Sequence, residues 1–488
     1  MFASNQKIPM SGLAIDCSML YNVKSRLQAA VDAAALGAGA MLRSSTDLSD
    51  PTQLANIKDA AQRFFNANYP AHYWGTTQAY YSATPSQNNN TQVRTIYVHA
   101  EEYAPMLFLR VLGINSSTVA AQATSSIRFV TAMIIVDRSG SVVRGGNVAT
   151  IQNALNSFVV YTPASTPAGQ SLFVDGRDVI GLVSFGGTTG GTAGNAIDYA
   201  PVSTFRSGGS TIATAINNIP FGNSGTNTAE GLYQAYTSLQ TLNNTGALNV
   251  IILLTDGRPS AFTVQMTPSA GSPCTNKTAK TGFITANVGL TWPPAPPNTW
   301  AGAQGASTIW TIGFFKPVFS GLDPNYGDMS FVANSTNCHY STDGGQPIPG
   351  ANAYLDFPAS FPATDIHGNS TTGPYYAGNN GQGQALNDPA ALRYASFNAA
   401  DNQATTIRRD TTIRPVLFVI GLNEPPAGGE PLDADWLARV ANDPNYVDSN
   451  GHPVYQAGQT AGIYYNVNGA GLAAAFQDIS SQILRLSQ

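Results

Sequence analysis

The feature that most constrains the fold is a set of uninterrupted apolar runs separated by segments with helical periodicity. Strands that are apolar at every position are typical of parallel sheets covered on both faces. Their alternation with helical segments predicts an α/β fold, with a doubly wound, mostly parallel sheet and helices on both sides. The strands are expected at 131–137, 178–186, 249–257, 416–422 and 462–467, with an edge strand at 197–203. The helices are expected at 147–160, 210–219, 228–242, 391–409, 432–443 and 471–487.

Residues 262–389 break this alternation. They are rich in Gly, Pro, Asn and Thr, and contain one clear strand-like run at 308–315. Because an unstructured loop of this length is uncommon in a compact domain, we expect an inserted subdomain between two strands of the sheet. It leaves the sheet at the carboxyl end of the strand at 249–257. It can either shape a ligand surface at that edge or cover it, and the sequence leaves both open.

The first part of the chain has a different pattern. Residues 11–42 predict one long helix, in which Leu13, Leu20, Leu27, Ala34 and Met41 recur every seven residues. The stripe indicates either packing on the chain's own domain or an assembly or anchoring element. A second helix, with Pro51 at its start, is expected at 51–69.

Strand-like runs follow at 91–100, 105–113 and 117–127, which predicts a small α+β domain. We therefore divide the chain as follows: helix and α+β region 1–128, first part of the α/β domain 129–261, insertion 262–389, and second part of the α/β domain 390–488.

Composition excludes several classes of protein. Only 10% of the 488 residues are charged, and Lys and Arg together number 23. A nucleic-acid-binding protein needs a strongly basic face, so this class is excluded. Hydrophobic residues at 43% are ample for packed cores. Neither a transmembrane span nor a signal peptide is predicted, so we expect a mature or truncated form.

Three cysteines are too few for a disulfide scaffold. Cys17 lies in the long helical pattern, and we expect it to be buried as a small apolar residue. Cys274 and Cys338 both lie in the insertion, where they either form a bridge or remain two thiols.

Polar motifs follow two of the buried strands and begin one helix. The run Asp137-Arg138-Ser139-Gly140-Ser141 follows the first strand, and Thr255-Asp256-Gly257 ends another. Gly225-Thr226-Asn227-Thr228 stands at the start of the helix at 228–242. In a doubly wound sheet the carboxyl ends of the strands gather at one edge, so we expect the three segments to converge there.

Together these segments supply two carboxylates and three hydroxyl groups and no soft ligand. An all-oxygen set suits a hard divalent cation, Mg²⁺ first, with Ca²⁺ or Mn²⁺ as alternatives. The predicted metal ligands are Asp137, Ser139, Ser141, Thr226 and Asp256. Such a set leaves a coordination position open for water or for a partner's carboxylate.

The D-x-S-x-S, G-T-N and T-D-G motifs on a doubly wound sheet resemble those of the von Willebrand factor A domain. That family holds a metal at a metal-ion-dependent adhesion site. The resemblance implies that the two serines and Thr226 bind the ion directly, with one or both aspartates acting through water. It also implies a non-catalytic domain.

Residues 12–40 carry a second resemblance. Gly12, Leu13, Ala14 and Asp16, followed by the run LQAAVDAAAL at 27–36, are similar to the start of the TadG-like proteins of the tight-adherence (Flp) pilus-assembly group. The residues 475–487 also resemble that group. The resemblance implies a pilin-like region before a von Willebrand-type domain, and a bacterial cell-surface, periplasmic or extracellular location. The apolar span that precedes Gly12 in that group is absent here, so membrane anchoring is expected only in a longer precursor.

Three functions compete. The first is a binding module whose metal captures an acidic group of a partner protein, or of a second copy, in adhesion or pilus assembly. The second is a structural subunit that polymerises through the long helix and the pilin-like region into a filament. The third is a metal-assisted hydrolase with Ser139 or Ser141 as nucleophile. No histidine base can be placed beside these serines from the sequence, so we expect no enzyme.

Overall fold

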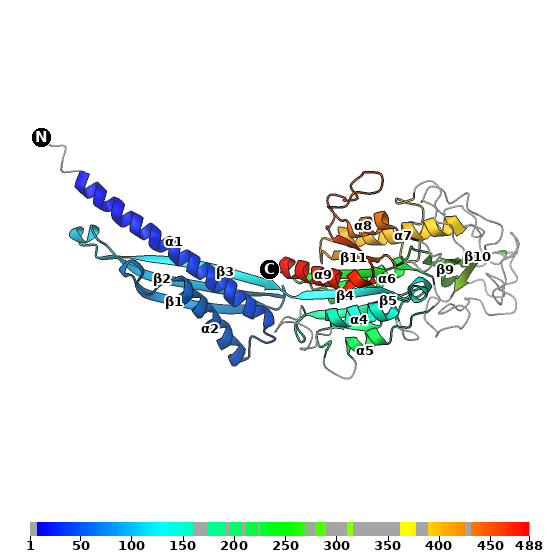
Figure 1. Cartoon of the computed structure of the whole chain (residues 1–488), viewed down its shortest axis with the longest axis horizontal. Helices are drawn as coiled ribbons and strands as arrows, with labels where there is room; N and C mark the ends of the chain where they lie inside the picture. The colour runs from blue at the N-terminus through cyan, green and yellow to red at the C-terminus, as the bar shows by residue number, and fades with distance from the viewer. Residues whose placement is uncertain are drawn as a thin grey trace. The chain divides into compact units, whose positions relative to one another are not determined.

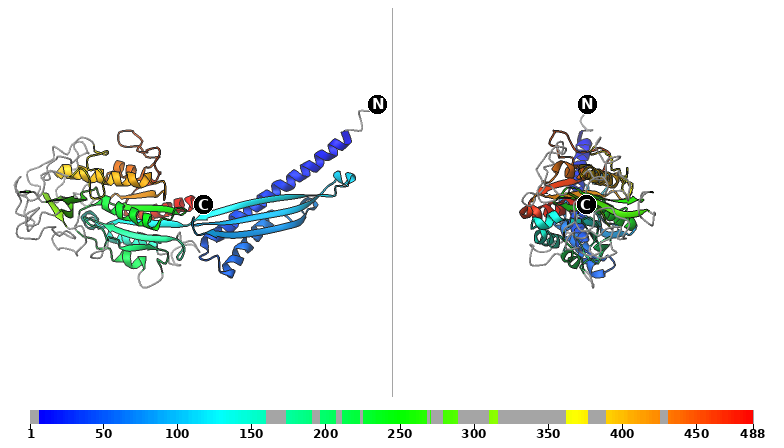
Figure 2. Two further views of the ribbon diagram at one scale, coloured as in Figure 1. Left: turned by 180° about the vertical axis from the view of Figure 1, so that it is seen from behind. Right: turned by 90° about the vertical axis from the view of Figure 1, so that its right-hand side faces the viewer.

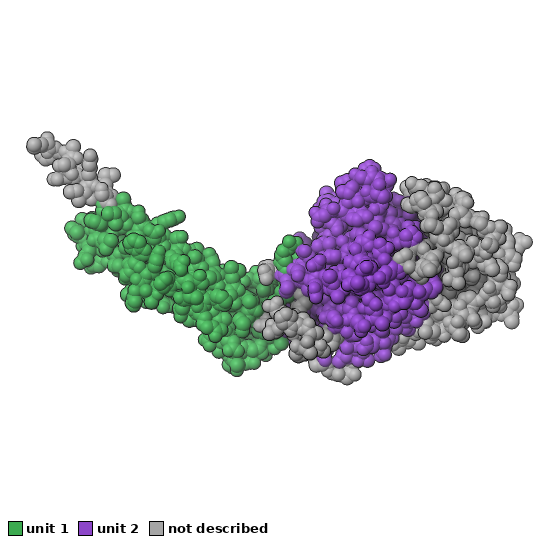
Figure 3. Space-filling view, in the orientation of Figure 1, with its two compact units in different colours: residues 1–129, 485–488 green, residues 130–484 purple. Residues whose placement is uncertain are grey.

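The computed structural model describes residues 7–159, 173–190, 196–206, 211–222, 225–267, 270, 279–288, 310–315, 362–376, 389–424 and 431–487. The chain divides into two compact units (Figure 3). The N-terminal unit comprises residues 1–129 with 485–488, and the C-terminal unit comprises residues 130–484.

The N-terminal unit consists of two helices and a three-stranded antiparallel sheet (Figure 1). Helix α1 spans Lys7–Ser44 and α2 spans Pro51–Asn68, with Asp50 as the N-cap residue of α2. The sheet has the order β1–β2–β3, with β1 at Thr77–Asn88, β2 at Val93–Pro105 and β3 at Ser116–Arg128. Two short 3-10 helices lie at Tyr73–Gly75 (η1) and Leu109–Leu112 (η2).

The small-residue stripe of α1 packs within its own unit. Ala30, Ala34 and Ala38 are fully buried in a core that also holds side chains of α2 and the sheet. A side chain at Gly37 would overlap the ring of Phe64 on α2, so the two helices are in close contact there. Of the two interpretations of the stripe, the structure therefore agrees with packing on the chain's own domain.

Three details of the N-terminal unit differ from the prediction. Residues 105–113 are not a strand: β2 ends at Pro105, and the apolar residues after it form η2. Strand β1 was not predicted, because its polar side chains and Pro85 give no apolar alternation. Cys17 is exposed rather than buried. The buried side of α1 follows Asp16, Met19 and Val23, which turns Cys17 away from the sheet.

The C-terminal unit contains the predicted doubly wound sheet, in the order β12–β11–β7–β4–β5–β6. The strand bounds are β4 Val130–Asp137, β5 Val179–Phe185, β6 Tyr199–Val202, β7 Leu248–Thr255, β11 Val416–Leu422 and β12 Ile463–Val467. All neighbours are parallel except β5 and β6, so β6 is an antiparallel edge strand. The expected fold class is confirmed.

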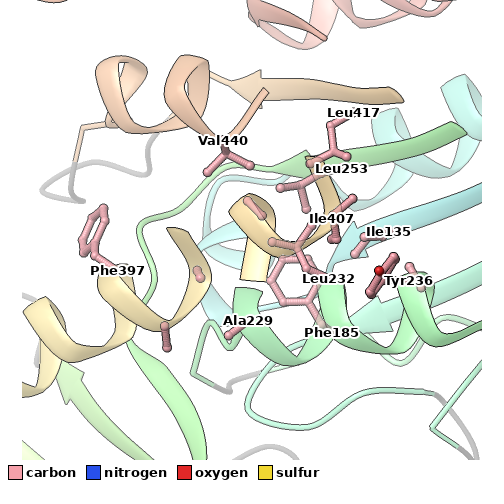
Figure 4. Packing of buried hydrophobic residues seen from close by; sticks show 14 of the residues in the cluster. Ile135, Phe185, Ala229, Leu232, Tyr236, Leu253, Phe397, Ile407, Leu417 and Val440 are labelled. Carbon is pink, nitrogen blue, oxygen red and sulfur yellow. The ribbon is translucent and has the colours of Figure 1, made fainter. Parts of the chain in front are cut away.

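Helices cover both faces of this sheet (Figures 1 and 2). Their bounds are α3 Gly140–Arg144, α4 Val148–Val159, α5 Ile212–Asn217, α6 Thr228–Leu242, α7 Pro389–Arg409, α8 Ala434–Ala441 and α9 Leu472–Leu486, with a 3-10 turn η4 at Gly469–Gly471. On one face, Leu232 of α6, Ile407 of α7 and Val440 of α8 pack over the sheet (Figure 4). On the other face, the ring of Phe158 of α4 packs at a tilt against that of Phe476 of α9. Every residue of β4 and β7 is therefore buried.

Three described strands in the region of the predicted insertion form a second antiparallel sheet, in the order β10–β9–β8. Its strands are β8 Ala261–Met266, β9 Lys280–Val288 and β10 Trp310–Phe315. Phe262, Val264 and Ile284 belong to the same apolar core as α6 and α7. Cys274, Cys338 and the Trp-Pro segment at 292–300 lie outside the described residues.

Candidate metal centre

The three predicted segments meet at the carboxyl edge of the large sheet. Asp137 is the last residue of β4, and Thr255 is the last residue of the neighbouring strand β7. Thr226 lies two residues before α6, whose N-cap is Asn227. Because β4 and β7 are buried on both faces and end together, the polar residues that follow them emerge side by side.

Hydrogen bonds join the first and third segments. One carboxylate oxygen of Asp137, Oδ1, accepts from the backbone N–H of Ser139 at 2.9 Å, and the other, Oδ2, accepts from the Thr255 hydroxyl at 2.5 Å. The hydroxyl oxygens of Ser139 and Ser141 lie 3.0 Å apart. The Ser141 hydroxyl donates to Oδ1 of Asp256 at 2.8 Å.

The second segment comes close at Gly257. A Cβ atom built at Gly257 would lie 3.3 Å from Oγ of Ser141, 3.7 Å from Oγ1 of Thr226 and 3.9 Å from Oδ2 of Asp137. Oxygens from the first and second segments thus lie within 4 Å of one point on the third segment. The missing side chain of Gly257 leaves that point free of a methyl group.

The two carboxylates are held in a poorly solvated place. Asp137 and Asp256 are 1% and 4% exposed. Burial raises the pKa of both carboxyls, and the charge of Asp137 raises that of Asp256 further. Hydrogen bonds from Ser139 and Thr255 lower the pKa of Asp137, and one from Ser141 lowers that of Asp256. The effect of burial is larger in both cases.

The donor set fits a hard divalent cation. Oδ2 of Asp256 is buried and accepts no hydrogen bond among the described residues. A buried carboxylate oxygen without a donor calls for a cation or a proton. Elsewhere among the described residues, no three His, Cys, Asp or Glu side chains gather as metal ligands. The candidate centre does not meet this criterion of three such side chains, because it has two carboxylates and its other three groups are hydroxyls.

Sequence reasoning missed two buried residues next to these ligands, of which Ser260 holds Thr226 in place. Ser260 accepts from the Thr226 backbone N–H through its hydroxyl at 2.9 Å, and its own N–H donates back to the Thr226 carbonyl at 2.9 Å. Arg138 is fully buried and donates to the Thr188 hydroxyl at 2.9 Å. No motif marks Ser260. Arg138 occupies the variable position of D-x-S-x-S, so neither residue gave a signal.

Strand β9 of the insertion lies beside the second segment. The Thr285 hydroxyl of β9 donates to the Ser260 carbonyl at 3.1 Å. A Cβ atom at Gly225 would lie 2.6 Å from Oγ1 of Thr285, so Gly225 makes room for that strand. β8 and β9 therefore pack against the segment that carries Thr226. Whether the rest of 262–389 covers the centre lies outside the described residues.

Comparison with protein families agrees with the fold of the C-terminal unit. Residues 133–289 match the von Willebrand factor type A domain, and the sheet continues beyond that match with β11 and β12. The chain is thus a protein with a von Willebrand factor type A domain. Residues 8–41 match the Flp pilus-assembly TadE/G-like family. Together the two matches identify a TadG-like protein of the bacterial cell surface or extracellular space.

Solved structures with detectable similarity include three pilus proteins. The von Willebrand domain of the type V pili tip protein Mfa5 from Porphyromonas gingivalis is 15% identical, over 74% of this chain and 97% of that one, with a TM-score of 0.35. The pilus adhesin RrgA from Streptococcus pneumoniae is 12% identical, over 82% and 49%, with a TM-score of 0.30. The adhesive tip pilin GBS104 from Group B Streptococcus agalactiae is 11% identical, over 73% and 100%, with a TM-score of 0.31. No curated protein matches the chain.

The two family matches support a pilus-associated adhesion protein, and both families are generally non-enzymatic. Within the part of the chain that the structure describes, no helix is both long enough and apolar enough to cross a membrane.

Proposed function

We propose that the von Willebrand domain binds a divalent cation through Asp137, Ser139, Ser141, Thr226 and Asp256. The bound ion then captures an acidic group of a partner protein in pilus-associated adhesion or assembly. The observation that carries the proposal is that oxygens of Asp137, Ser141 and Thr226, from two separate segments, surround the space at Gly257 of the third. The third segment is joined to the first by the hydrogen bond from Ser141 to Asp256.

The surrounding residues prepare this site for an ion. The Thr255 hydroxyl and the Ser139 N–H fix the carboxylate of Asp137 from two sides. Ser141 orients one oxygen of Asp256, which leaves the other oxygen available. When bound, the ion supplies a positive charge for a partner carboxylate. Because the set holds only two carboxylates, their negative charges balance the charge of a divalent ion without exceeding it.

Mg²⁺ is the first choice of ion, with Ca²⁺ or Mn²⁺ as alternatives. The hydroxyl-rich set and the compact space at Gly257 favour the smaller ion, which keeps water ligands that a partner group can replace. Calorimetric titration with each of the three ions distinguishes them.

The filament function is the weaker candidate. Its motivating surface was the small-residue stripe of α1, and Ala30, Ala34 and Ala38 of that stripe are buried in the chain's own core. The hydrolase function also lacks support. Among the hydrogen bonds of the described residues, no histidine reaches Ser139 or Ser141.

The test is Mg²⁺ titration of the full chain by calorimetry. Wild type and Asp478→Asn, a matched control that removes an exposed carboxylate of α9, are expected to bind one ion. Asp137→Ala is expected to lose binding while keeping its circular dichroism spectrum. Equal Mg²⁺ binding by Asp137→Ala and wild type overturns the metal site.

The acidic-partner step needs its own probe. Immobilised poly-glutamate is expected to retain the wild type in Mg²⁺ and to release it in chelator. Poly-glutamine of the same length is expected to retain no protein in either condition. If Mg²⁺ binds normally but poly-glutamate retains nothing, the metal site survives and capture of an acidic group is wrong.

A further inference from the structure

The loop that joins β2 to β3 in the N-terminal unit carries an exposed apolar cluster. We call Leu107, Phe108, Val111, Leu112 and Ile114 the apolar tip. Val111 is 84% exposed and Leu112 is 77% exposed, while the other three are close to half exposed. A concentration of exposed large apolar side chains in eight residues is a mark of an interaction surface.

Helix α1 extends this surface. A Cβ atom at Gly12 would lie 2.8 Å from the ring of Phe108, so the start of α1 is in direct contact with the apolar tip. Leu13 and Ile15, on the same turn of α1, are also about half exposed. Figure 1 shows the β2–β3 loop at the same end of the N-terminal unit as the start of α1.

The backbone of the tip is hydrogen-bonded internally. The carboxylate of Asp16 on α1 accepts from the N–H groups of Leu107 at 2.9 Å, Phe108 at 3.1 Å and Leu109 at 2.8 Å. Further N–H groups along the loop bond to carbonyls of the same loop; they belong to Met106, Val111, Gly113 and Ile114. A segment that enters a lipid phase must satisfy its backbone in this way, because hydrocarbon offers no partner.

The charge of the apolar tip also fits a lipid surface. Arg110 is the one charged residue in the loop 106–115 and is exposed. The nearby acid, Asp16, has no solvent exposure and directs its carboxylate at the loop backbone. The surface is thus apolar with a positive charge and no exposed negative charge. This combination complements a bilayer with anionic head groups.

We propose that the apolar tip inserts into the interfacial layer of a lipid bilayer with anionic head groups, that of the producing cell. Val111 and Leu112 enter the acyl region, and Arg110 contacts the head groups. The N-terminal unit then binds the membrane peripherally, without any described helix crossing it. This inference is independent of the metal site, which lies in the other unit.

The experiment is co-sedimentation of the full chain with vesicles of phosphatidylethanolamine and phosphatidylglycerol, compared with phosphatidylcholine vesicles. The double variant Val111→Asp/Leu112→Asp is expected to weaken binding at least tenfold. Val447→Asp, which changes an exposed valine of the C-terminal unit in the same way, serves as the matched control. Arg110→Gln is expected to reduce binding to the anionic vesicles and leave the weak binding to phosphatidylcholine unchanged.

A second measurement reports insertion directly. In Leu112→Trp the new indole is expected to be quenched by brominated lipids, whereas in Val447→Trp it is not. Wild type that fails to sediment with anionic vesicles overturns the proposal, and so does a double variant that binds as tightly as wild type. Self-association in sedimentation velocity that the double variant abolishes, without vesicle binding by wild type, assigns the tip to a second copy of the chain and also overturns it.

Discussion

The hydroxyl of Ser141 donates to Oδ1 of Asp256 at 2.8 Å, although 115 positions separate the two residues in the sequence. The bond joins helix α3, which follows β4, to the loop after β7. It directs one carboxylate oxygen toward the serine and leaves Oδ2 buried without a described donor. This arrangement supports the proposed cation site, and the consequences of that proposal can be measured.

Gly257→Ala is expected to weaken Mg²⁺ binding at least tenfold, about 1.4 kcal/mol. The added methyl group would lie 3.3 Å from Oγ of Ser141 and within 4 Å of the oxygens of Thr226 and Asp137, where the ion is proposed to sit. Calorimetry gives the affinity. Gly373→Ala, whose Cβ meets nothing within 4 Å, is the control. Undiminished affinity in Gly257→Ala would place the ion elsewhere.

Removal of divalent ions is expected to lower the thermal stability of the C-terminal unit. An ion that binds the folded state alone adds about 2.7 kcal/mol at a concentration one hundred times its dissociation constant. Differential scanning calorimetry of wild type should show the shift on adding Mg²⁺ and its reversal by chelator. Asp256→Asn should shift much less, and Asp478→Asn should shift as wild type does. A shift of equal size in all three proteins contradicts the assigned ligands.

The sheet and its motifs could be predicted because they are local features. β4, β7 and β11 are apolar at nearly every position, and the motif residues directly follow β4 and β7 or precede α6. The residues that orient the ligands could not be predicted in this way. Ser260 reaches Thr226 across 34 positions. Nothing in its own neighbourhood distinguishes it from any other serine.

The N-terminal unit shows the same limit. The apolar run Met106–Leu112 has the composition of a strand, but Asp16, some 90 positions away, binds three successive N–H groups and stabilises a 3-10 turn instead. Likewise, the heptad spacing in α1 predicted Leu13 on the buried side. Leu13 is exposed because the buried side there follows Asp16 and Met19. A sequence pattern gives the period of a helix but not which neighbour it meets.

Asp198 is expected to make the stability of the C-terminal unit depend on pH. Burial raises its pKa to about 6, although the N–H and hydroxyl of Ser184 both donate to it. Between pH 3.8 and 6 the unfolded chain has lost this proton while the folded chain keeps it, so stability falls as the pH rises through this window. Above the window the cost is constant, at about 3 kcal/mol.

Asp198→Asn removes this titration. The free energy of unfolding of the variant, relative to that of wild type, should increase by about 2 kcal/mol from pH 4.5 to pH 7.5. Urea unfolding at the two pH values measures the difference. Asp478→Asn, which removes an exposed carboxylate, should follow wild type at both. A difference between Asp198→Asn and wild type that is independent of pH would mean that Asp198 titrates normally in the folded protein.

Asp16→Ala is expected to destabilise the N-terminal unit, because the N–H groups of Leu107, Phe108 and Leu109 lose their acceptor. Burial raises the pKa of Asp16, but the three backbone donors outweigh it and lower the pKa below its usual value. The stabilisation is therefore present above pH 3.8 and is lost as the pH falls through the lowered value. At pH 7 the melting temperature of this unit should fall by about 5 °C or more.

Circular dichroism melts at pH 7 and pH 2.5 test this, with Asp59→Ala on the exposed side of α2 as the control. Asp59→Ala should melt as wild type does at both pH values, whereas the gap between Asp16→Ala and wild type should narrow at pH 2.5. Melting curves of Asp16→Ala and wild type that coincide at pH 7 would show that the loop at 107–109 does not depend on this carboxylate. A gap of the same size at pH 2.5 would show that Asp16 acts through packing and not through its charge.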